Sequence, residues 1–109
     1  MPKKKQQPKT IISNKQARQL RALGHHLHPL AMVGREGISD SVLSAVNEVL
    51  TSRELVKIKI QNNCPIDRKD VAQSLSAATG AAVAQVIGKM ILLYRTNPDL
   101  PPDKKIILA

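Results

Sequence analysis

The sequence predicts a single α/β domain built on a mixed four-stranded sheet. Apolar residues recur at helical spacing in three stretches of the chain, which predicts three helices. Alternating or continuous apolar runs at residues 30–33, 55–60, 82–87 and 90–95 are typical of strands. The chain has 109 residues, of which 42% are hydrophobic, and this length suits one core rather than two.

We expect the first helix to begin after Ser13. Ser13 and Gln16 have the spacing of a capping box, in which each side chain bonds to the backbone N–H of the other residue. Gly24 is expected to end this helix in the left-handed conformation. Three apolar residues at helical spacing should face the core, namely Ala17, Leu20 and Leu23.

The distribution of charge indicates a polyanionic partner. The net charge is +9, and residues 1–35 carry eight Lys or Arg and no Asp or Glu. Such asymmetry is typical of proteins that bind nucleic acid; a solubility tail without a specific partner and an anionic membrane surface are the alternatives. Residues 1–10, with four lysines and two prolines, are predicted to form a disordered basic arm. The positive charge continues along the first helix through Lys15, Arg18 and Arg21, although an ordinary solvated face is the alternative.

A glycine loop, Gly34-Arg35-Glu36-Gly37, joins the strand at residues 30–33 to a second helix. Glycine permits positive φ and the close approach of another backbone, and the unpaired amides at a helix start suit a phosphate. Arg35 adds a cation at the tip. The Lys-Ser/Thr ending of a P-loop is missing, whereas KH domains clamp a nucleic-acid backbone with a Gly-x-x-Gly loop. Many Gly-x-x-Gly loops are simple turns. The prediction that this loop binds a phosphate therefore depends on its position between a strand and a helix.

Two further polar segments are candidates for phosphate contact. His28 belongs to a run of three histidines followed by Pro29, which favours an extended turn. No further ligands complete a tetrahedral set, so we predict no metal site there. In residues 55–60, Lys57 and Lys59 alternate with apolar residues, which gives either a basic strand edge or the ordinary alternation of a half-buried sheet.

The second half of the chain predicts a third helix and a hairpin. Asp67 is the expected N-cap of this helix, and Gly80 is its natural end. The turn Gly88-Lys89 has glycine at the first central position, which suits a type II′ hairpin. The third helix should bury three apolar residues, Val71, Leu75 and Ala78.

These elements give a mixed sheet. Strand-helix-strand units favour parallel pairing through right-handed crossovers, whereas the final hairpin is antiparallel. Residues 90–93 are apolar on both alternating faces, so we expect a central strand that is covered on both sides, with the first helix on one of them. The domain is expected to span residues 11–97. Residues 98–109 are expected to form a C-terminal tail, in which residues 104–109 are either a short extra strand or a disordered end.

Several blocks of residues resemble the pattern of the YhbY/CRM family across residues 13–95. They are His28-Pro29-Leu30, Met32-Val33-Gly34 with Gly37, the strand at residues 55–60, Val86-Ile87-Gly88-Lys89 and Leu92-Leu93-Tyr94-Arg95. The resemblance implies a fold similar to the C-terminal domain of bacterial translation initiation factor three. Single-domain members of the family are associated with precursors of the large ribosomal subunit, and multi-domain plant members with intron splicing. The resemblance also implies RNA binding through the glycine loop Gly34, Arg35, Glu36 and Gly37, flanked by Lys15, Arg18 and Arg21.

Other functional classes fit the sequence less well. No catalytic motif joins the candidate nucleophiles and bases, and no cofactor or small-molecule site is predicted. No segment approaches the roughly 20 apolar residues of a membrane span, no secretory leader is evident, and the single cysteine cannot form an internal disulfide. We therefore expect a monomeric cytoplasmic protein that is not an enzyme and binds ribosomal RNA during large-subunit assembly. A splicing or small-RNA cofactor, a DNA-binding protein and a protein-interaction module on ribosomal particles are the alternatives.

Overall fold

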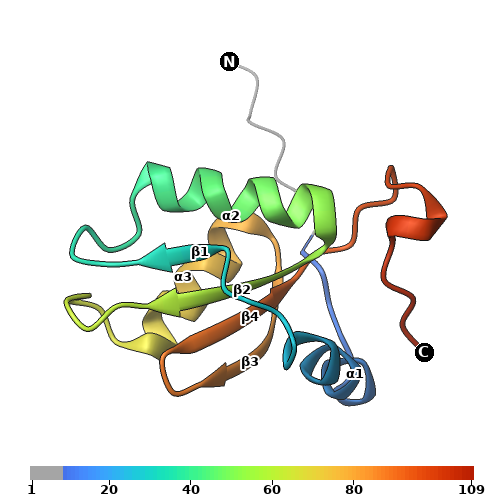
Figure 1. Cartoon of the computed structure of the whole chain (residues 1–109), viewed down its shortest axis with the longest axis horizontal. Coiled ribbons are helices and arrows are strands. Elements are labelled where there is room, and N and C mark those ends of the chain that lie inside the picture. Colours follow the sequence, from blue (N-terminus) through green and yellow to red (C-terminus); the bar gives the residue numbers. More distant parts are fainter. Residues whose placement is uncertain (1–8) are drawn as a thin grey trace.

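A four-stranded sheet with helices on both faces forms the centre of the fold (Figure 1). The computed structural model describes residues 9–109, so the basic arm predicted for residues 1–10 lies almost wholly outside the described residues. The predicted order of helices and strands is confirmed. The elements are α1 (Asn14–Gly24), β1 (Ala31–Val33), α2 (Asp40–Arg53), β2 (Leu55–Ile60), α3 (Arg68–Thr79), β3 (Ala82–Ile87), β4 (Met90–Tyr94) and the 3-10 turn η1 (Pro102–Lys104).

The last strand, β4, lies inside the sheet. The strand order is β1-β2-β4-β3, with β1 parallel to β2 and β4 antiparallel to both of its neighbours. Ile91, Leu92 and Leu93 are each at most 2% exposed, as predicted for a strand that is covered on both faces. Because β4 enters between β2 and β3, the turn that precedes it comes to lie beside the end of β2.

The sheet carries a core on each face. On one face, Leu50 of α2 and Leu75 of α3 are fully buried against the strands. On the other face, α1 covers the side that α2 and α3 leave open, as predicted. Burying a leucine side chain is worth roughly 1.5–3 kcal/mol, so Leu20 of α1 contributes appreciably to holding this helix on the sheet. Leu20 is fully buried among Leu55, Ala84, Leu92 and Tyr94.

The predicted helix caps and the predicted hairpin turn are present in the structure, except at Gly24. Ser13 Oγ accepts from the N–H of Gln16 at 3.1 Å, and the Gln16 side chain accepts from the N–H of Ser13 at 3.0 Å. Asp67 caps α3 by accepting a backbone N–H two residues further on at 3.2 Å. Gly80 ends α3 with φ 76°, and Gly88 begins the hairpin turn with φ 57°, as a type II′ turn requires.

The role predicted for Gly24 is wrong. This residue does not adopt the left-handed conformation; it is the buried last residue of α1, and His25 caps the helix with φ −56°. A Cβ on Gly24 would lie 2.6 Å from Leu92 Cδ2. The missing side chain therefore lets the C-terminal end of α1 settle directly on β4.

Two apolar residues predicted to face the core do not. Leu23 is 48% exposed, because α1 turns Leu20 rather than Leu23 to the sheet. Ala78 of α3 is also exposed. Thr79 is buried beside it, since its hydroxyl donates to Leu75 O at 2.7 Å and no longer needs water.

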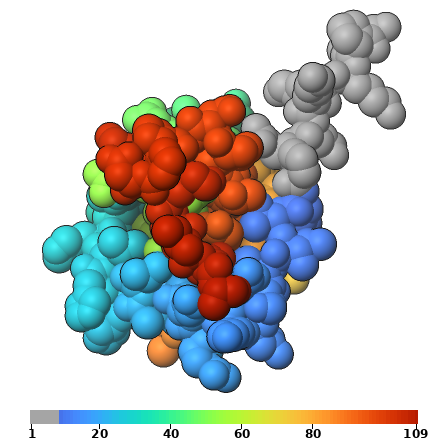
Figure 2. Space-filling view, turned by 90° about the vertical axis from the view of Figure 1, so that its right-hand side faces the viewer, coloured from blue at the N-terminus to red at the C-terminus, as the bar shows by residue number. Residues whose placement is uncertain are grey.

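The C-terminal segment, residues 98–109, folds back onto the domain. It contains η1 and no strand, and residues 104–109 are held by contacts with the domain, so they form neither the predicted short strand nor a disordered end. Ile106 and Leu108 pack against the core that contains Leu20 and Tyr94. Figure 2 shows this segment (red) crossing the surface between α2 (green) and α1 (blue). The C-terminal segment thus completes the cover that α1 begins.

Glu54 fastens the C-terminal segment to the domain. Its backbone caps α2 in the left-handed region with φ 66°, and its side chain is fully buried. The carboxylate accepts from the N–H of Asn97 at 2.6 Å, the N–H of Ile106 at 2.7 Å and the Nζ of Lys105 at 3.0 Å. A left-handed non-glycine residue costs roughly 1–2 kcal/mol. Hydrogen bonds to a charged group, worth roughly 1.5–3 kcal/mol each, offset that cost.

The contacts of Glu54 also set its ionisation. Burial by itself raises the pKa of this carboxyl, because a charged group is poorly solvated there. The N–H groups of Asn97 and Ile106 and the ammonium of Lys105 outweigh burial, and they hold the pKa below its ordinary value of 4.5. Since the pKa is lower in the folded chain than in the unfolded one, the ionised carboxylate stabilises the fold at neutral pH. That stabilisation is lost as the pH falls below the ordinary value and through the folded-state pKa.

Arg95 is a structural residue rather than a surface cation. It is 6% exposed, and its guanidinium donates to Asn47 Oδ1 at 2.7 Å, to Thr51 Oγ1 at 3.0 Å and to Thr79 O at 2.9 Å. Burial lowers the pKa of Arg95. These bonds join α2 and α3 to the end of β4, so this arginine is not available to an external anion.

Glu54→Gln is expected to lower the free energy of unfolding by about 2 kcal/mol at pH 7. A neutral amide oxygen accepts hydrogen bonds more weakly than a carboxylate, and the NH₂ group would face the N–H donors that the carboxylate now binds. The deficit should be smaller at an acidic pH below the ordinary carboxyl pKa of 4.5, because the unaltered chain progressively loses the stabilisation from its own ionised carboxylate there. Urea unfolding at both pH values measures this. Glu48→Gln, on the exposed side of α2, is the matched control. A deficit that is the same at both pH values would contradict the role of the ionised carboxylate.

Candidate nucleic-acid interface

The glycine loop is a tight turn whose tip is exposed to solvent. The N–H of Gly37 donates to Gly34 O at 2.9 Å, which places Arg35 and Glu36 at the two central positions. Both of these side chains are exposed. Gly37 is buried and has φ 67°, so its conformation requires glycine. The loop thus presents Arg35 outward on a closely folded backbone.

The start of α2 offers less to an anion than the sequence suggested. Ile38 and Ser39 separate the glycine loop from the helix, and Ser39 Oγ already accepts from the N–H of Val42 at 3.2 Å. Asp40 places a carboxylate in the first turn, where it complements the helix dipole and repels a phosphate. Anion binding at this edge therefore depends on the loop tip and its neighbours rather than on the helix.

Three turns meet at this edge of the sheet (Figure 1). They are the glycine loop, the turn at residues 61–64 and the hairpin turn that contains Lys89. Backbone hydrogen bonds hold them together, since the N–H of Gln61 donates to Val33 O at 2.8 Å and the N–H of Ile60 donates to Lys89 O at 2.7 Å. The chain thus gathers at one place three segments that are far apart in the sequence.

Lys89 and Arg68 belong to this edge, although the sequence did not single them out for binding. Lys89 is exposed at the tip of the hairpin. Arg68, also exposed, opens α3 and donates from Nη1 to Gly88 O at 3.0 Å. The hairpin turn itself was predicted, but its position beside the glycine loop depends on the pairing of β4 with β2, which no local pattern reveals.

Lys57 and Lys59 lie on the face of the sheet that α1 partly covers. The residues between and beside them, Val56, Ile58 and Ile60, are buried toward α2 and α3. Lys59 is exposed and Lys57 is half-buried. The alternation is therefore that of a half-buried sheet, and it also leaves a lysine on the open part of the face.

α1 lies at the opposite end of the sheet from the glycine loop (Figure 1). Lys15 and Arg18 are exposed on this helix, and Arg21 is half-buried. The structure therefore does not place these three residues directly beside the loop, as the family resemblance implied. They form a second group of cations on the same side of the sheet.

The strand β2 connects the two groups of cations. Gly24, at the end of α1, packs on Leu92, whose partner across the sheet is Lys57. The N–H of Leu30 donates to Lys57 O at 3.0 Å, so the turn that carries the exposed His28 also lies near this strand. From there β2 runs to the turn beside the glycine loop. The predicted residues thus follow a line along β2 rather than forming one cluster.

The two faces of the sheet differ in charge. α1 and all four strands contain no Asp or Glu, whereas α2 and α3 carry Asp40, Glu48 and Asp70. Within residues 9–109 the only ion pair joins Lys105 to the buried Glu54, so the cations along β2 form no salt bridge there. We name this side of the molecule the basic face; its cations are Lys15, Arg18, Arg21, Arg35, Lys57, Lys59 and Lys89, with His28 beside them.

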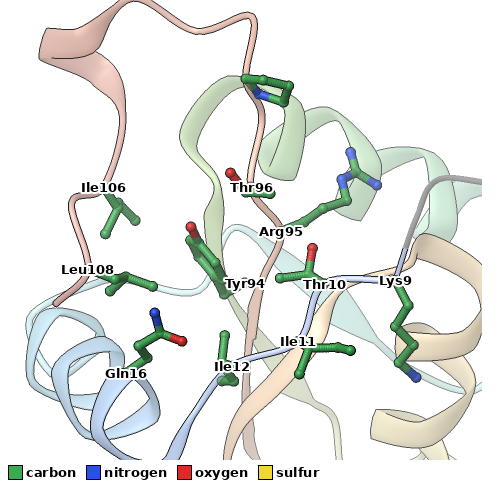
Figure 3. A pocket seen from close by; sticks show the side chains of 11 residues that line it. Lys9, Thr10, Ile11, Ile12, Gln16, Tyr94, Arg95, Thr96, Ile106 and Leu108 are labelled. Atoms are coloured by element: carbon green, nitrogen blue, oxygen red, sulfur yellow. The ribbon is translucent and has the colours of Figure 1, made fainter.

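Other features of the surface lie apart from the basic face. A pocket of about 490 Å³ opens between residues 9–12, Tyr94 and the C-terminal segment (Figure 3). Burial raises the pKa of Tyr94.

In the described part of the chain, no three His, Cys, Asp or Glu side chains gather closely enough to hold a metal ion. None of the helices in residues 9–109 has the length and apolar character needed to cross a membrane.

Comparison with known proteins agrees with the sequence pattern. The CRS1 / YhbY (CRM) domain matches residues 12–95. A Bacillus subtilis protein named "Probable RNA-binding protein YqeI" is 36% identical over 89 residues, which are 82% of this chain and 93% of that protein. A Pseudomonas aeruginosa protein, also named as a probable RNA-binding protein, is 34% identical over 95 residues, which are 87% of this chain and 89% of that one.

A solved structure shares the fold. A Staphylococcus aureus protein with a known solution structure is 35% identical in sequence to this chain. The two structures match with a TM-score of 0.74 over 91% of this chain and 100% of that one. The domain match includes the glycine loop, all four strands and the whole of α1. The chain therefore belongs to the CRS1 / YhbY (CRM) domain family.

Proposed function

We propose that this protein binds RNA through its basic face. The observation that carries the proposal is the separation of charge, since α2 and α3 hold carboxylates whereas α1 and the strands hold none. The names of the two bacterial relatives, which refer to RNA binding, support it. RNA is a dense array of phosphates, and a face of cations without neighbouring carboxylates attracts such an array.

We infer that most of the affinity comes from the RNA backbone and its shape. Tyr94 is the only Phe, Tyr or Trp residue of the chain and is 6% exposed, so no large aromatic ring is available for stacking on bases, and the exposed imidazoles of His25, His26 and His28 are the rings that remain. Arg35 and the backbone of the glycine loop, Gly34 to Gly37, approach one phosphate, and Lys57 and Lys59 extend the contact along β2. Glu36 contributes through its backbone N–H, because its carboxylate repels phosphate.

The partner that we propose is ribosomal RNA in precursors of the large subunit. Residues 12–95 match the CRM domain, and the match to the Bacillus subtilis relative covers 93% of that protein, so the proposal follows the single-domain members of the family, which the resemblance associates with such precursors. On this proposal the protein acts in the cytoplasm as a monomer, and it works by binding RNA rather than by catalysing a reaction.

Lys59→Glu is expected to weaken RNA binding by about tenfold or more, because it places a negative charge beside the phosphates. A plot of log Kd against log salt concentration should also become shallower by about one unit. Fluorescence anisotropy with a labelled RNA duplex measures both quantities. Lys69→Glu is the matched control, since Lys69 is exposed on α3 behind the sheet. Equal losses in the two variants, or an affinity that does not respond to salt, would show that the basic face is not the binding site.

The ribosomal partner is tested by sedimentation of the tagged protein from a cell lysate, with and without RNase. Migration with large-subunit precursors that RNase abolishes is the expected result. Migration that survives RNase would favour docking on a ribosomal protein. Protein that remains at the top of the gradient in low salt would contradict the ribosomal partner and favour a splicing or small-RNA role.

A further inference from the structure

A shallow hollow lies on the basic face beside the glycine loop. It has a volume of about 730 Å³ and opens between the ends of β1 and β2 and the hairpin turn. Three carboxamides, two ammonium groups and one thioether converge there, and no carboxylate lines it. The side chains concerned are those of Met32, Lys59, Gln61, Asn62, Asn63 and Lys89.

Gly34 leaves space for the carboxamide of Gln61. A Cβ on Gly34 would lie 2.4 Å from Gln61 Oε1 and 3.5 Å from Asn63 Oδ1. The Gln61 carboxamide is held in turn by its contact of 3.5 Å from Nε2 to Met32 Sδ. Gly34 does not have a positive φ. Its lack of a side chain therefore leaves space for the Gln61 carboxamide and does not set the conformation of the loop.

The remaining groups of the hollow are free to meet a ligand. Asn62 and Asn63 are exposed at the central positions of the turn at residues 61–64. A carboxamide presents a donor and an acceptor side by side, which matches the edge of a nucleobase and, best, the N6 and N7 atoms of adenine. Met32, which is 53% exposed, offers a polarisable surface to the face of a base. Lys59 can reach the phosphate on one side of that base.

We propose that the hollow binds one unpaired nucleotide of the RNA, with adenine preferred, while the rest of the basic face holds the phosphates of the flanking helix. The inference rests on the proposed RNA binding and adds a choice of base to it. Side chains cannot read the deep major groove of an RNA helix, whereas a bulged base leaves the stack and exposes its edges. A hollow of this volume is large enough for one nucleotide.

The test compares the affinity of the whole chain for a set of RNA hairpins with one common stem, either fully paired or with a single unpaired A, C, G or U. The stem with the unpaired A is expected to bind about tenfold more tightly than the paired stem. Asn62→Ala combined with Asn63→Ala should abolish this difference, while the affinity for the paired stem changes by less than about twofold. Gln73→Ala, which removes an exposed carboxamide from α3 behind the sheet, should leave the preference intact.

Equal affinity for all the hairpins overturns the inference and leaves the proposed RNA binding in place. A preference for the unpaired A that survives in the double variant also overturns it. Gly34→Ala is a second probe, because its Cβ displaces the Gln61 carboxamide without a change in φ, and it should reduce the preference in a chain that circular dichroism shows to be folded. Failure to bind any of the hairpins at low salt contradicts the proposed function itself.

Discussion

The position of β4 between β2 and β3 is the constraint on which the rest of the structure depends. β4 pairs with both neighbours, and its side chains are buried on both faces, so each face of the sheet needs a cover. α2 and α3 cover one face. α1 and the C-terminal segment cover the other only around Leu92 and Tyr94. The far end of that face stays open, and Met32 and Lys59 are exposed there.

Charged residues serve two separate purposes in this molecule. Glu54 and Arg95 are buried and fully engaged in hydrogen bonds, so they hold the C-terminal segment and the two rear helices to the sheet. The cations of the basic face, by contrast, form no salt bridge within residues 9–109. The charges that stabilise the fold are therefore buried, whereas the exposed cations on one side give a positive electrostatic potential that attracts a polyanion.

Much of the fold could be predicted from the sequence, because its signals are local. The capping box at Ser13, the left-handed Gly80 and the hairpin turn at Gly88 depend on residues within one or two turns of chain. The predictions failed where a distant partner decides the outcome. Gly24 is glycine because Leu92 lies against it, and Glu54 tolerates a left-handed backbone because the C-terminal segment supplies its hydrogen bonds.

The candidate site shows the same division. Residue types and the glycine loop could be read from the sequence, including Arg35 and the exposed Lys59. Their arrangement could not, since the resemblance placed the cations of α1 beside the loop and the structure places them at the far end of β2. The hairpin lysine and the carboxamides at residues 61–63 join the edge only through strand pairing.

Mapping of the RNA contact by nuclear magnetic resonance tests the central claim most directly. The isotope-labelled protein would be titrated with an RNA duplex, and the backbone amide shifts followed residue by residue. The shifts are expected to concentrate at the glycine loop, along β2 from Lys57, at the hairpin turn and on α1. The outward residues of α2 and α3, such as Glu48 and Asp70, should not respond. Shifts confined to α2 and α3 would contradict the assignment of RNA binding to the basic face.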